Sequence, residues 1–204
     1  RVLNLNERGH DAKDIKQAAY LIKENGFSLG LQMMVGLYGS DLESEWYTAK
    51  QFTKLIPDTV RIYPTVVLES TKLAELMRES LYTPMTFNDM VEICTGLLVF
   101  FEDEGIKVIR CGLHDSESLR SNMIGGVFHP AFREICESKI FFDRCVKFLT
   151  NEKKRVKDIV LLVNPKDLSK ALGHKKKNLI SLNEMGYHIR FAQDGRVPQG
   201  HMRM

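Results

Sequence analysis

The stretch Leu29-Gly-Leu-Gln-Met-Met-Val-Gly-Leu-Tyr-Gly-Ser-Asp41 decides the fold class of this 204-residue chain. It belongs to a mostly apolar run that starts at Phe27, is too short for a helix and lies between glycines, which is typical of a buried strand in a parallel sheet. Gly36 and Gly39 then predict a turn. The segment 40–43 has the spacing of a capping box, so we expect Ser40 to cap the next helix.

Helices and strands alternate on both sides of this stretch. Asp11 predicts a helix cap, and Gly26 predicts the end of that helix. Further strands are expected over 59–63 and 106–111, and further helices over 40–56, 71–78 and 86–104. This order predicts an α/β fold with a parallel sheet and right-handed crossovers. Three strands leave bare edges, so we expect either missing upstream strands or another chain to pair with the sheet.

Composition excludes several classes of protein. Hydrophobic residues make up 44% and charged residues 27%, which is typical of a globular protein. No apolar run reaches the roughly 18 residues of a membrane-spanning helix, so no membrane partner is expected. The N-terminus has no signal peptide. Because the chain starts at Arg1 rather than Met, we expect it to be a piece of a longer protein.

The cysteines predict neither a disulfide scaffold nor a metal site. The four are scattered along the chain with separations of 17, 25 and 9 residues, at Cys94, Cys111, Cys136 and Cys145. No pair has the C-x-x-C spacing of a zinc ribbon or a dithiol redox site. Reduced thiols in a cytoplasmic protein are the expected state.

The last quarter of the chain differs in charge from the rest. Residues 151–204 hold 12 Lys and Arg against 5 Asp and Glu, whereas residues 1–150 hold 17 against 21. After a linking stretch over 151–157, the pattern predicts a strand over 158–163, helices over 165–172 and 179–185, and a strand over 187–191. The final ten residues are expected to be mobile. A basic segment after an acidic body indicates two parts with different partners.

Several motifs, in order and at matching spacing, resemble the second half of a radical S-adenosylmethionine (radical SAM) enzyme. They are the stretch 29–41, Val60-Arg-Ile-Tyr-Pro-Thr-Val-Val-Leu-Glu-Ser-Thr-Lys-Leu73, Asn6-Glu-Arg-Gly-His10, Lys107-Val-Ile-Arg-Cys-Gly-Leu113 and His129-Pro-Ala-Phe-Arg-Glu134. The resemblance covers residues 1–150 and is closest to the Elongator catalytic-subunit-like group. Oxygen-independent coproporphyrinogen III oxidase is a more distant relative.

This resemblance implies a partial (βα) barrel with parallel strands, followed by a small basic α+β module. The implied domains are residues 1–113 as the second half of the barrel, 114–150 as its C-terminal extension, and 151–204 as the basic module. Ligands of such folds lie at the C-terminal ends of the strands. The full-length protein is therefore expected to hold S-adenosylmethionine and a [4Fe–4S] cluster.

The resemblance also implies a set of cofactor-binding residues, which are Gln32, Gly36, Gly39, Ser40, Arg61 and Tyr63. The Gln32 amide can bond to a ribose diol. The glycines let the backbone approach a cofactor, the amides near Ser40 can hold an anion, and Arg61 can pair with a carboxylate. The alternatives are a satisfied core amide for Gln32, a structural ion pair for Arg61 and core packing for Tyr63.

Two departures from the family pattern matter. Tyr38 stands where the family's turn usually has proline. The cluster-binding C-x-x-x-C-x-x-C, which supplies three thiolates, is absent, and the scattered cysteines cannot replace it. We therefore expect no cofactor in this chain alone and no activity from it, and we assign no catalytic residue.

The basic segment resembles a KH-type nucleic-acid module, in which a G-x-x-G turn between two helices clamps the nucleic-acid backbone. Gly173 is present, but Lys176 occupies the second glycine position. The implied phosphate contacts come from Lys175, Lys176, Lys177 and Arg190. The alternative is a solvated turn with no ligand.

Three functions remain open at this point. The first is the C-terminal portion of a radical SAM iron–sulfur enzyme acting on RNA, and the Elongator-like resemblance implies a wobble uridine of transfer RNA. The second is a non-catalytic RNA-binding or scaffold protein derived from a radical SAM barrel. The third is an enzyme like coproporphyrinogen oxidase, against which the basic tail argues.

Overall fold

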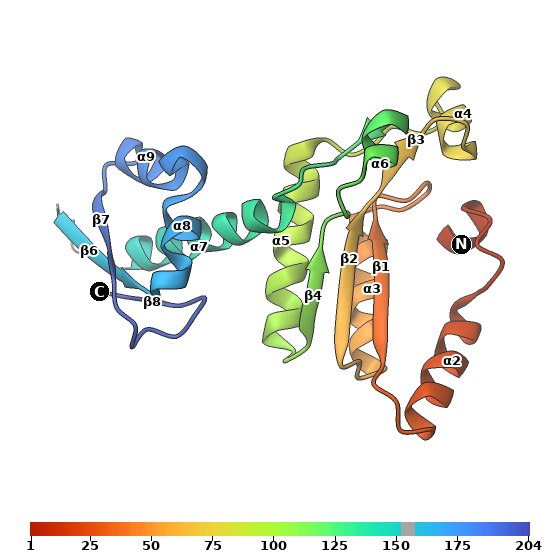
Figure 1. Ribbon diagram of the computed structural model, residues 1–204, viewed down its shortest axis with the longest axis horizontal. Helices are drawn as coiled ribbons and strands as arrows, with labels where there is room; N and C mark the ends of the chain where they lie inside the picture. Colours follow the sequence, from red (N-terminus) through yellow and green to blue (C-terminus); the bar gives the residue numbers. More distant parts are fainter. Residues whose placement is uncertain (152–157) are drawn as a thin grey trace. The chain divides into compact units, whose positions relative to one another are not determined.

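The computed structural model describes residues 1–151 and 158–204, so most of the predicted linking stretch lies outside the described residues. The chain divides into two compact units, Arg1–Phe132 and Arg133–Met204 (Figure 1). The division falls inside the segment that the sequence analysis assigns to a barrel extension. The domain boundaries expected from the sequence stay predictions.

A three-stranded parallel sheet organises the first unit, as the sequence predicts. Its strands are β1 (Gly30–Val35), β2 (Thr59–Pro64) and β4 (Lys107–Cys111), in the order β1-β2-β4. Their register aligns Gln32 with Arg61, and Arg61 with Arg110. The register shifts after Val60, so Ile109 has no partner in β2 and forms a bulge. The described strands leave the outer edge of β1 unpaired.

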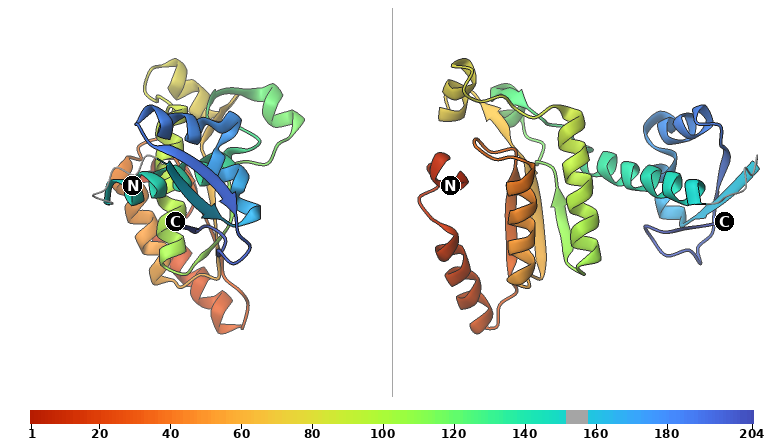
Figure 2. Two further views of the ribbon diagram at one scale, coloured as in Figure 1. Left: turned by 90° about the vertical axis from the view of Figure 1, so that its left-hand side faces the viewer. Right: turned by 180° about the vertical axis from the view of Figure 1, so that it is seen from behind.

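Two helices cover one face of this sheet. They are α3 (Leu42–Lys54), which packs against β1, and α5 (Phe87–Asp103), which packs against β4 and α3 (Figures 1 and 2). Alternate strand residues point toward them and are buried, together with apolar helix residues: Met33, Val35, Ala49, Val60, Ile62, Leu97 and Phe101. This layer is the core of the unit.

Helix starts follow local side-chain chemistry. Asp11 caps α2 (Ala12–Glu24), as predicted, and Figures 1 and 2 show this helix beyond the β1 edge of the sheet. The prediction that Ser40 caps α3 is wrong by one residue. Asp41 is the cap, because its carboxylate accepts from the Ser44 N–H at 2.8 Å while the Ser44 hydroxyl accepts from the Asp41 N–H at 2.8 Å. The Ser40 hydroxyl instead donates to the Leu37 carbonyl.

Small elements that the sequence analysis missed complete the unit. They are α1 (Val2–Leu5), β3 (Val66–Leu68), α6 (Glu117–Asn122) and β5 (Met123–Gly126), whereas α4 (Lys72–Arg78) was expected. Strands β3 and β5 pair antiparallel. Gly126 permits this pairing because it has a φ of +87°, and a Cβ there would lie 2.6 Å from the Thr65 carbonyl oxygen.

The second unit has its own sheet and core. Its elements are α7 (Phe132–Asn151), which begins at the last residue of the first unit, β6 (Asp158–Val163), η1 (Pro165–Asp167), α8 (Leu168–Leu172), η2 (His174–Lys176), α9 (Lys177–Glu184), β7 (His188–Gln193) and β8 (Met202–Arg203). Strand β6 lies between a parallel β7 and an antiparallel β8. The expectation of a mobile tail is wrong at Met202 and Arg203, which extend this sheet. Cys145, Leu161 and Leu182 are fully buried in the core.

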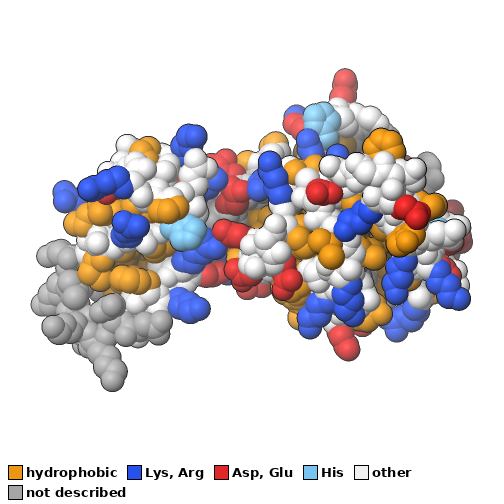
Figure 3. Space-filling view, turned by 90° about the horizontal axis from the view of Figure 1, so that it is seen from below, with side chains coloured by type: hydrophobic (Ala, Val, Ile, Leu, Met, Phe, Trp, Pro, Cys, Tyr) orange, Lys and Arg blue, Asp and Glu red, His pale blue; other side chains and the backbone are white. Residues whose placement is uncertain are grey.

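The surface of the second unit is basic in part. Within this unit, Figure 3 shows Lys and Arg side chains around exposed hydrophobic surface.

In the described ranges, no helix combines the length and apolarity needed to cross a membrane.

A buried carboxylate anchors the loop that follows β1. Glu45 on α3 is 3% exposed, and its Oε1 accepts from the Gly36 N–H at 2.8 Å. On the other side of the loop, the Tyr82 hydroxyl donates to the Gly36 carbonyl at 2.7 Å. Burial raises the pKa of Glu45, although its bond from Gly36 opposes the shift. Glu45 and Tyr82 together fix the chain at the C-terminal end of β1.

We predict that Glu45→Gln flattens the pH dependence of stability. A raised carboxyl pKa means that the folded state holds its proton to higher pH than the unfolded state does, so stability falls as pH rises above the ordinary carboxyl pKa of 4.5. A glutamine oxygen still accepts from Gly36 without the cost of a buried charge. Urea unfolding should find the variant more stable than the unsubstituted chain at pH 8, with the difference shrinking toward pH 4.

The matched control is Glu43→Gln, which removes an exposed charge from the same helix and should not change this pH profile. A Glu45→Gln variant that is less stable than the unsubstituted chain at pH 8 contradicts this account of the anchor.

Candidate functional site

The second face of the first sheet is open to solvent. Its middle row is Gln32, Arg61 and Arg110, one residue from each strand, and all three are exposed. Met34 and Tyr63 form the next row toward the C-terminal ends of the strands, and both are half-buried. A parallel sheet ordinarily buries both faces. We call this surface the open face, and it presents polar groups where a core would be expected.

Three of the predicted cofactor-binding residues therefore lie together on the open face, namely Gln32, Arg61 and Tyr63. Among the described residues, neither Gln32 nor Arg61 has a hydrogen-bond or ion-pair partner. Their side chains are thus available to a ligand. Arg110 joins them, although the sequence analysis did not single it out.

The loop residues Gly36, Gly39 and Ser40 are already engaged within the chain. Both backbone polar groups of Gly36 are bonded, to Glu45 and to Tyr82. The Gly39 carbonyl accepts from Arg1 at 2.8 Å, and the Leu5 side chain fills the space where a Cβ of Gly39 would stand. The Ser40 hydroxyl donates to Leu37. The structure thus places these three residues in a closed loop rather than on the open face.

Tyr82 is a further residue of this region that sequence reasoning missed. Burial raises the pKa of its hydroxyl to about 12, and the nearby Glu45 charge contributes to the shift. The hydroxyl therefore stays protonated at neutral pH and keeps donating to Gly36. Glu45 could have been noticed because it shares the inward stripe of α3 with Ala49 and Phe52, where a charge is unusual.

A buried hydroxyl without a partner lies at the end of β2. Thr65 is 3% exposed, and its Oγ1 has no hydrogen-bond partner within the described part of the chain. Buried polar atoms are normally satisfied, so such an atom indicates a bound water or a ligand group. It follows Pro64, at the edge where ligands of parallel α/β folds bind.

These observations can be compared with what S-adenosylmethionine and a [4Fe–4S] cluster, the two cofactors that the family resemblance implies, would need. An exposed amide in the middle of β1, together with a half-buried tyrosine and an orphaned hydroxyl near the C-terminal end of β2, fits a nucleoside cofactor such as S-adenosylmethionine. The cysteines do not fit an iron–sulfur cluster, because all four are buried and lie far apart in sequence. In the described residues, no three His, Cys, Asp or Glu side chains come together as metal ligands.

The basic turn of the second unit has unusual backbone geometry. Lys175 and Lys176 have φ angles of 50° and 61°, in the left-handed region that favours glycine. Lys176 stands where a G-x-x-G turn has its second glycine, and its backbone has a conformation that glycine adopts readily. Such strain costs on the order of 1 kcal/mol or more for each residue and is concentrated at functional sites.

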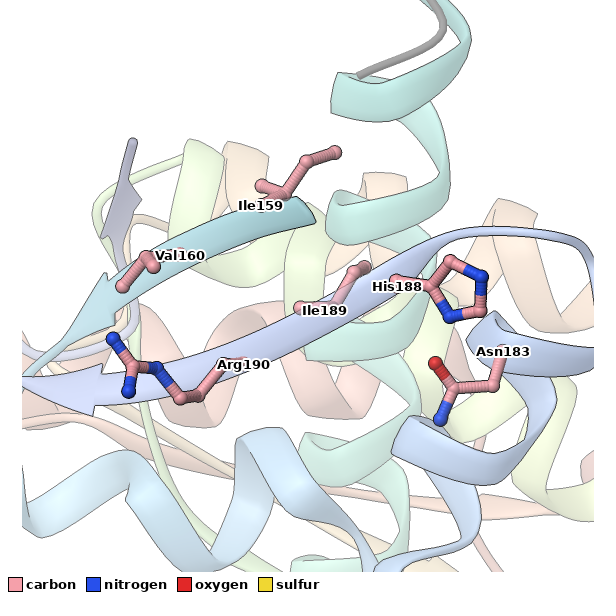
Figure 4. Close-up of a pocket in the computed structure, with 6 residues that line it drawn as sticks. All are labelled: Ile159, Val160, Asn183, His188, Ile189 and Arg190. Atoms are coloured by element: carbon pink, nitrogen blue, oxygen red, sulfur yellow. The ribbon is translucent and has the colours of Figure 1, made fainter. Parts of the chain in front are cut away.

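Arg190 lies apart from the lysines. It lines a pocket of about 380 Å³ with Asn183 and His188, as Figure 4 shows. Asn183 is near the end of α9, whereas Lys177 is its first residue. The structure thus places Lys175, Lys176 and Lys177 at one end of α9, and the pocket that Arg190 lines reaches the other end.

One family model matches this chain, the radical SAM C-terminal domain, over residues 57–141. The match covers β2, the α5–β4 unit and the first half of α7. It thus includes Arg61, Tyr63 and Arg110 of the open face.

Curated relatives are similar over part of the chain. A tRNA uridine(34) acetyltransferase of Methanocaldococcus jannaschii is 33% identical over 45% of this chain and 18% of its own length. Another, from Dehalococcoides mccartyi, is 29% identical over 72% of this chain and 32% of its own length. Human Elongator complex protein 3 is 32% identical over 45% of this chain and 17% of its own. The chain thus matches a third or less of each of these relatives.

A solved structure shows a related fold. The archaeal Elp3 of Methanocaldococcus infernus with an N-terminal deletion superposes with a TM-score of 0.57 at 23% identity, over 76% of this chain and 34% of that one. The family model and the relatives agree with the motifs around Arg61 and Tyr63. Residues 57–141 therefore match a radical SAM C-terminal domain, and part of the chain is similar to tRNA uridine(34) acetyltransferases and to Elongator complex protein 3.

Proposed function

We propose that this chain is the C-terminal portion of a radical SAM iron–sulfur enzyme that acts on RNA, with transfer RNA as the substrate class. The observation that carries the proposal is the open face, a polar surface on a parallel sheet whose strands β2 and β4 lie in the stretch that matches the radical SAM C-terminal domain. The names of the relatives, tRNA uridine(34) acetyltransferases and Elongator complex protein 3, support the substrate class. The chain alone, without the cluster motif, is inactive.

In this proposal the open face is the inner wall of a partial barrel. Strands outside this chain pair with the free edge of β1 and carry the cluster. Such a cluster would be held by residues outside this chain and would supply reducing power for S-adenosylmethionine. Phe27 and Tyr20 are 70% and 67% exposed in the segment leading to β1, which supports a further element of the same protein packing there. Four buried cysteines, none of which forms a disulfide within the described part of the chain, support a reducing, cytoplasmic location.

The residues of this chain bind and orient S-adenosylmethionine. Gln32 bonds to the ribose hydroxyls, Tyr63 lies beside it toward the strand ends, and Arg61 is near enough to meet an anionic group. Gly36, Gly39 and Ser40 form the loop that shapes this end of the sheet. Its anchors, Glu45 and Tyr82, keep that loop in place without touching the ligand.

We predict that Gln32→Ala weakens binding of S-adenosylmethionine to the complete protein by about tenfold, because two hydrogen bonds to the ribose are lost. Calorimetric titration measures this directly. The control is Gln17→Ala on the exposed side of α2, for which affinity should not change. If the Gln32 variant binds the cofactor as tightly as the control, Gln32 has only a structural role.

We propose a second, separate role for the basic turn, which is contact with the RNA backbone. It is supported by three adjacent exposed lysines and by the left-handed backbone at Lys175 and Lys176. Arg190 contributes from the pocket that reaches the other end of α9. This role is also what a non-catalytic RNA-binding protein would retain.

Replacing Lys175, Lys176 and Lys177 together by Ala should weaken RNA binding and flatten its dependence on salt, since each lost phosphate contact reduces the slope by about one. Fluorescence anisotropy with a transfer RNA at several salt concentrations measures both quantities. Replacing Lys13, Lys16 and Lys23 of α2 removes the same charge elsewhere and is the matched control. Equal losses in both triple variants would show only a general charge effect.

A further inference from the structure

Two arginines stand side by side on the open face, and no acidic side chain of residues 1–151 and 158–204 forms an ion pair with them. Arg61 and Arg110 are register partners on neighbouring strands, and both are exposed. Neighbouring strands lie about 4.8 Å apart, so the two guanidinium groups can reach one small ligand. No ion pair or hydrogen bond within the described residues involves either guanidinium.

The surroundings of the pair are basic and carry no acid from the sheet. Strands β1, β2 and β4 contain no Asp or Glu, and Lys107 lies one row below the pair, beside Thr59. Arg8 from the N-terminal segment also reaches the open face, where it contacts the Met34 sulfur. Like charges directly across a sheet destabilise it. A pair of arginines kept in that arrangement therefore indicates an anionic ligand.

We infer that Arg61 and Arg110 form a phosphate-binding pair, and that the phosphate belongs to a nucleotide of the substrate. One guanidinium suffices for a carboxylate, whereas two in register offer enough donors for the several oxygens of a phosphate. Tyr63, in the next row, presents an aromatic side chain against which a base can stack. The inference rests on the proposed function for the nucleotide. It adds Arg110, and it assigns Arg61 and Tyr63 to the substrate nucleotide instead of to S-adenosylmethionine, which leaves Gln32 as the cofactor contact.

The bulge at Ile109 is what brings the second arginine to the pair. With Val108 buried on the helix-covered face, regular alternation would place Ile109 on the open face and Arg110 under the helices. The extra residue reverses this order, so Arg110 aligns with Arg61 and Cys111 returns to the buried side. Bulges that re-aim a side chain are frequent beside binding sites.

The test uses the 204-residue chain, titrated with uridine 5′-monophosphate, uridine and inorganic phosphate at low ionic strength. The variants are Arg61→Gln, Arg110→Gln and, as a matched control, Lys50→Gln on the exposed side of α3. Each arginine variant should weaken binding of the monophosphate about tenfold, and the control less than twofold. Uridine affinity should be the same in all four proteins.

Comparing the three titrated ligands tells whether the site binds a nucleotide or free phosphate. Tighter binding of the monophosphate than of inorganic phosphate supports a nucleotide, and equal affinities overturn the nucleotide assignment. Loss in Arg61→Gln but not in Arg110→Gln overturns the pair, as does loss equal to that of the control. Because neither arginine has a partner in the part of the chain that the structure describes, their variants should unfold at the same or a slightly higher urea concentration, which excludes misfolding as the cause.

Failure here is distinguishable from failure of the proposed function, because the titrations need neither S-adenosylmethionine nor a cluster. A complete protein that does not bind S-adenosylmethionine would leave the phosphate result standing. If the complete protein binds S-adenosylmethionine normally but either arginine variant binds the monophosphate at full strength, only the assignment of the phosphate-binding pair is wrong.

Discussion

The structure depends on one constraint, which is that a parallel sheet needs cover on both faces while this sheet has it on one. Helices α3 and α5 bury Val35, Val60 and Ile62 on the covered side. The opposite side carries an amide, two arginines and a tyrosine in two aligned rows. A surface of that composition cannot take another apolar layer without burying charges. It suits the water-lined or ligand-lined inside of a partial barrel.

The β1–α3 loop shows how this unit fixes the end of its sheet without a ligand. Gly36 is bonded through its N–H to a buried carboxylate and through its carbonyl to a buried hydroxyl. Leu5 of α1 closes over Gly39. The loop glycines thus serve packing and anchoring, and the free donors stay on the strands at Gln32, Arg61 and Arg110. The basic turn of the second unit differs from this loop. Lys175 and Lys176 have left-handed backbone conformations, so the backbone strain lies at exposed residues.

Features that depend on neighbouring residues, such as helix caps and strand positions, could be predicted from the sequence. Asp11 caps α2 as expected, and the three parallel strands lie where apolar runs end at turn residues. Ser40 was the wrong cap because Ser44, rather than Glu43, supplies the reciprocal bond. The pairing of β3 with β5 joins two very short segments far apart in sequence, which no local pattern reveals. Arg110 was missed because the bulge at Ile109 breaks the alternation that assigns strand faces.

The central claim is that strands beyond this chain complete the sheet at β1, and amide hydrogen exchange tests it most directly. Alternate N–H groups of Gly30–Val35 point away from β2 to the free edge and should exchange fast in the 204-residue chain. In the longer protein the same amides should become strongly protected, because a neighbouring strand accepts their hydrogen bonds. Equal exchange of these amides in both proteins would contradict the account.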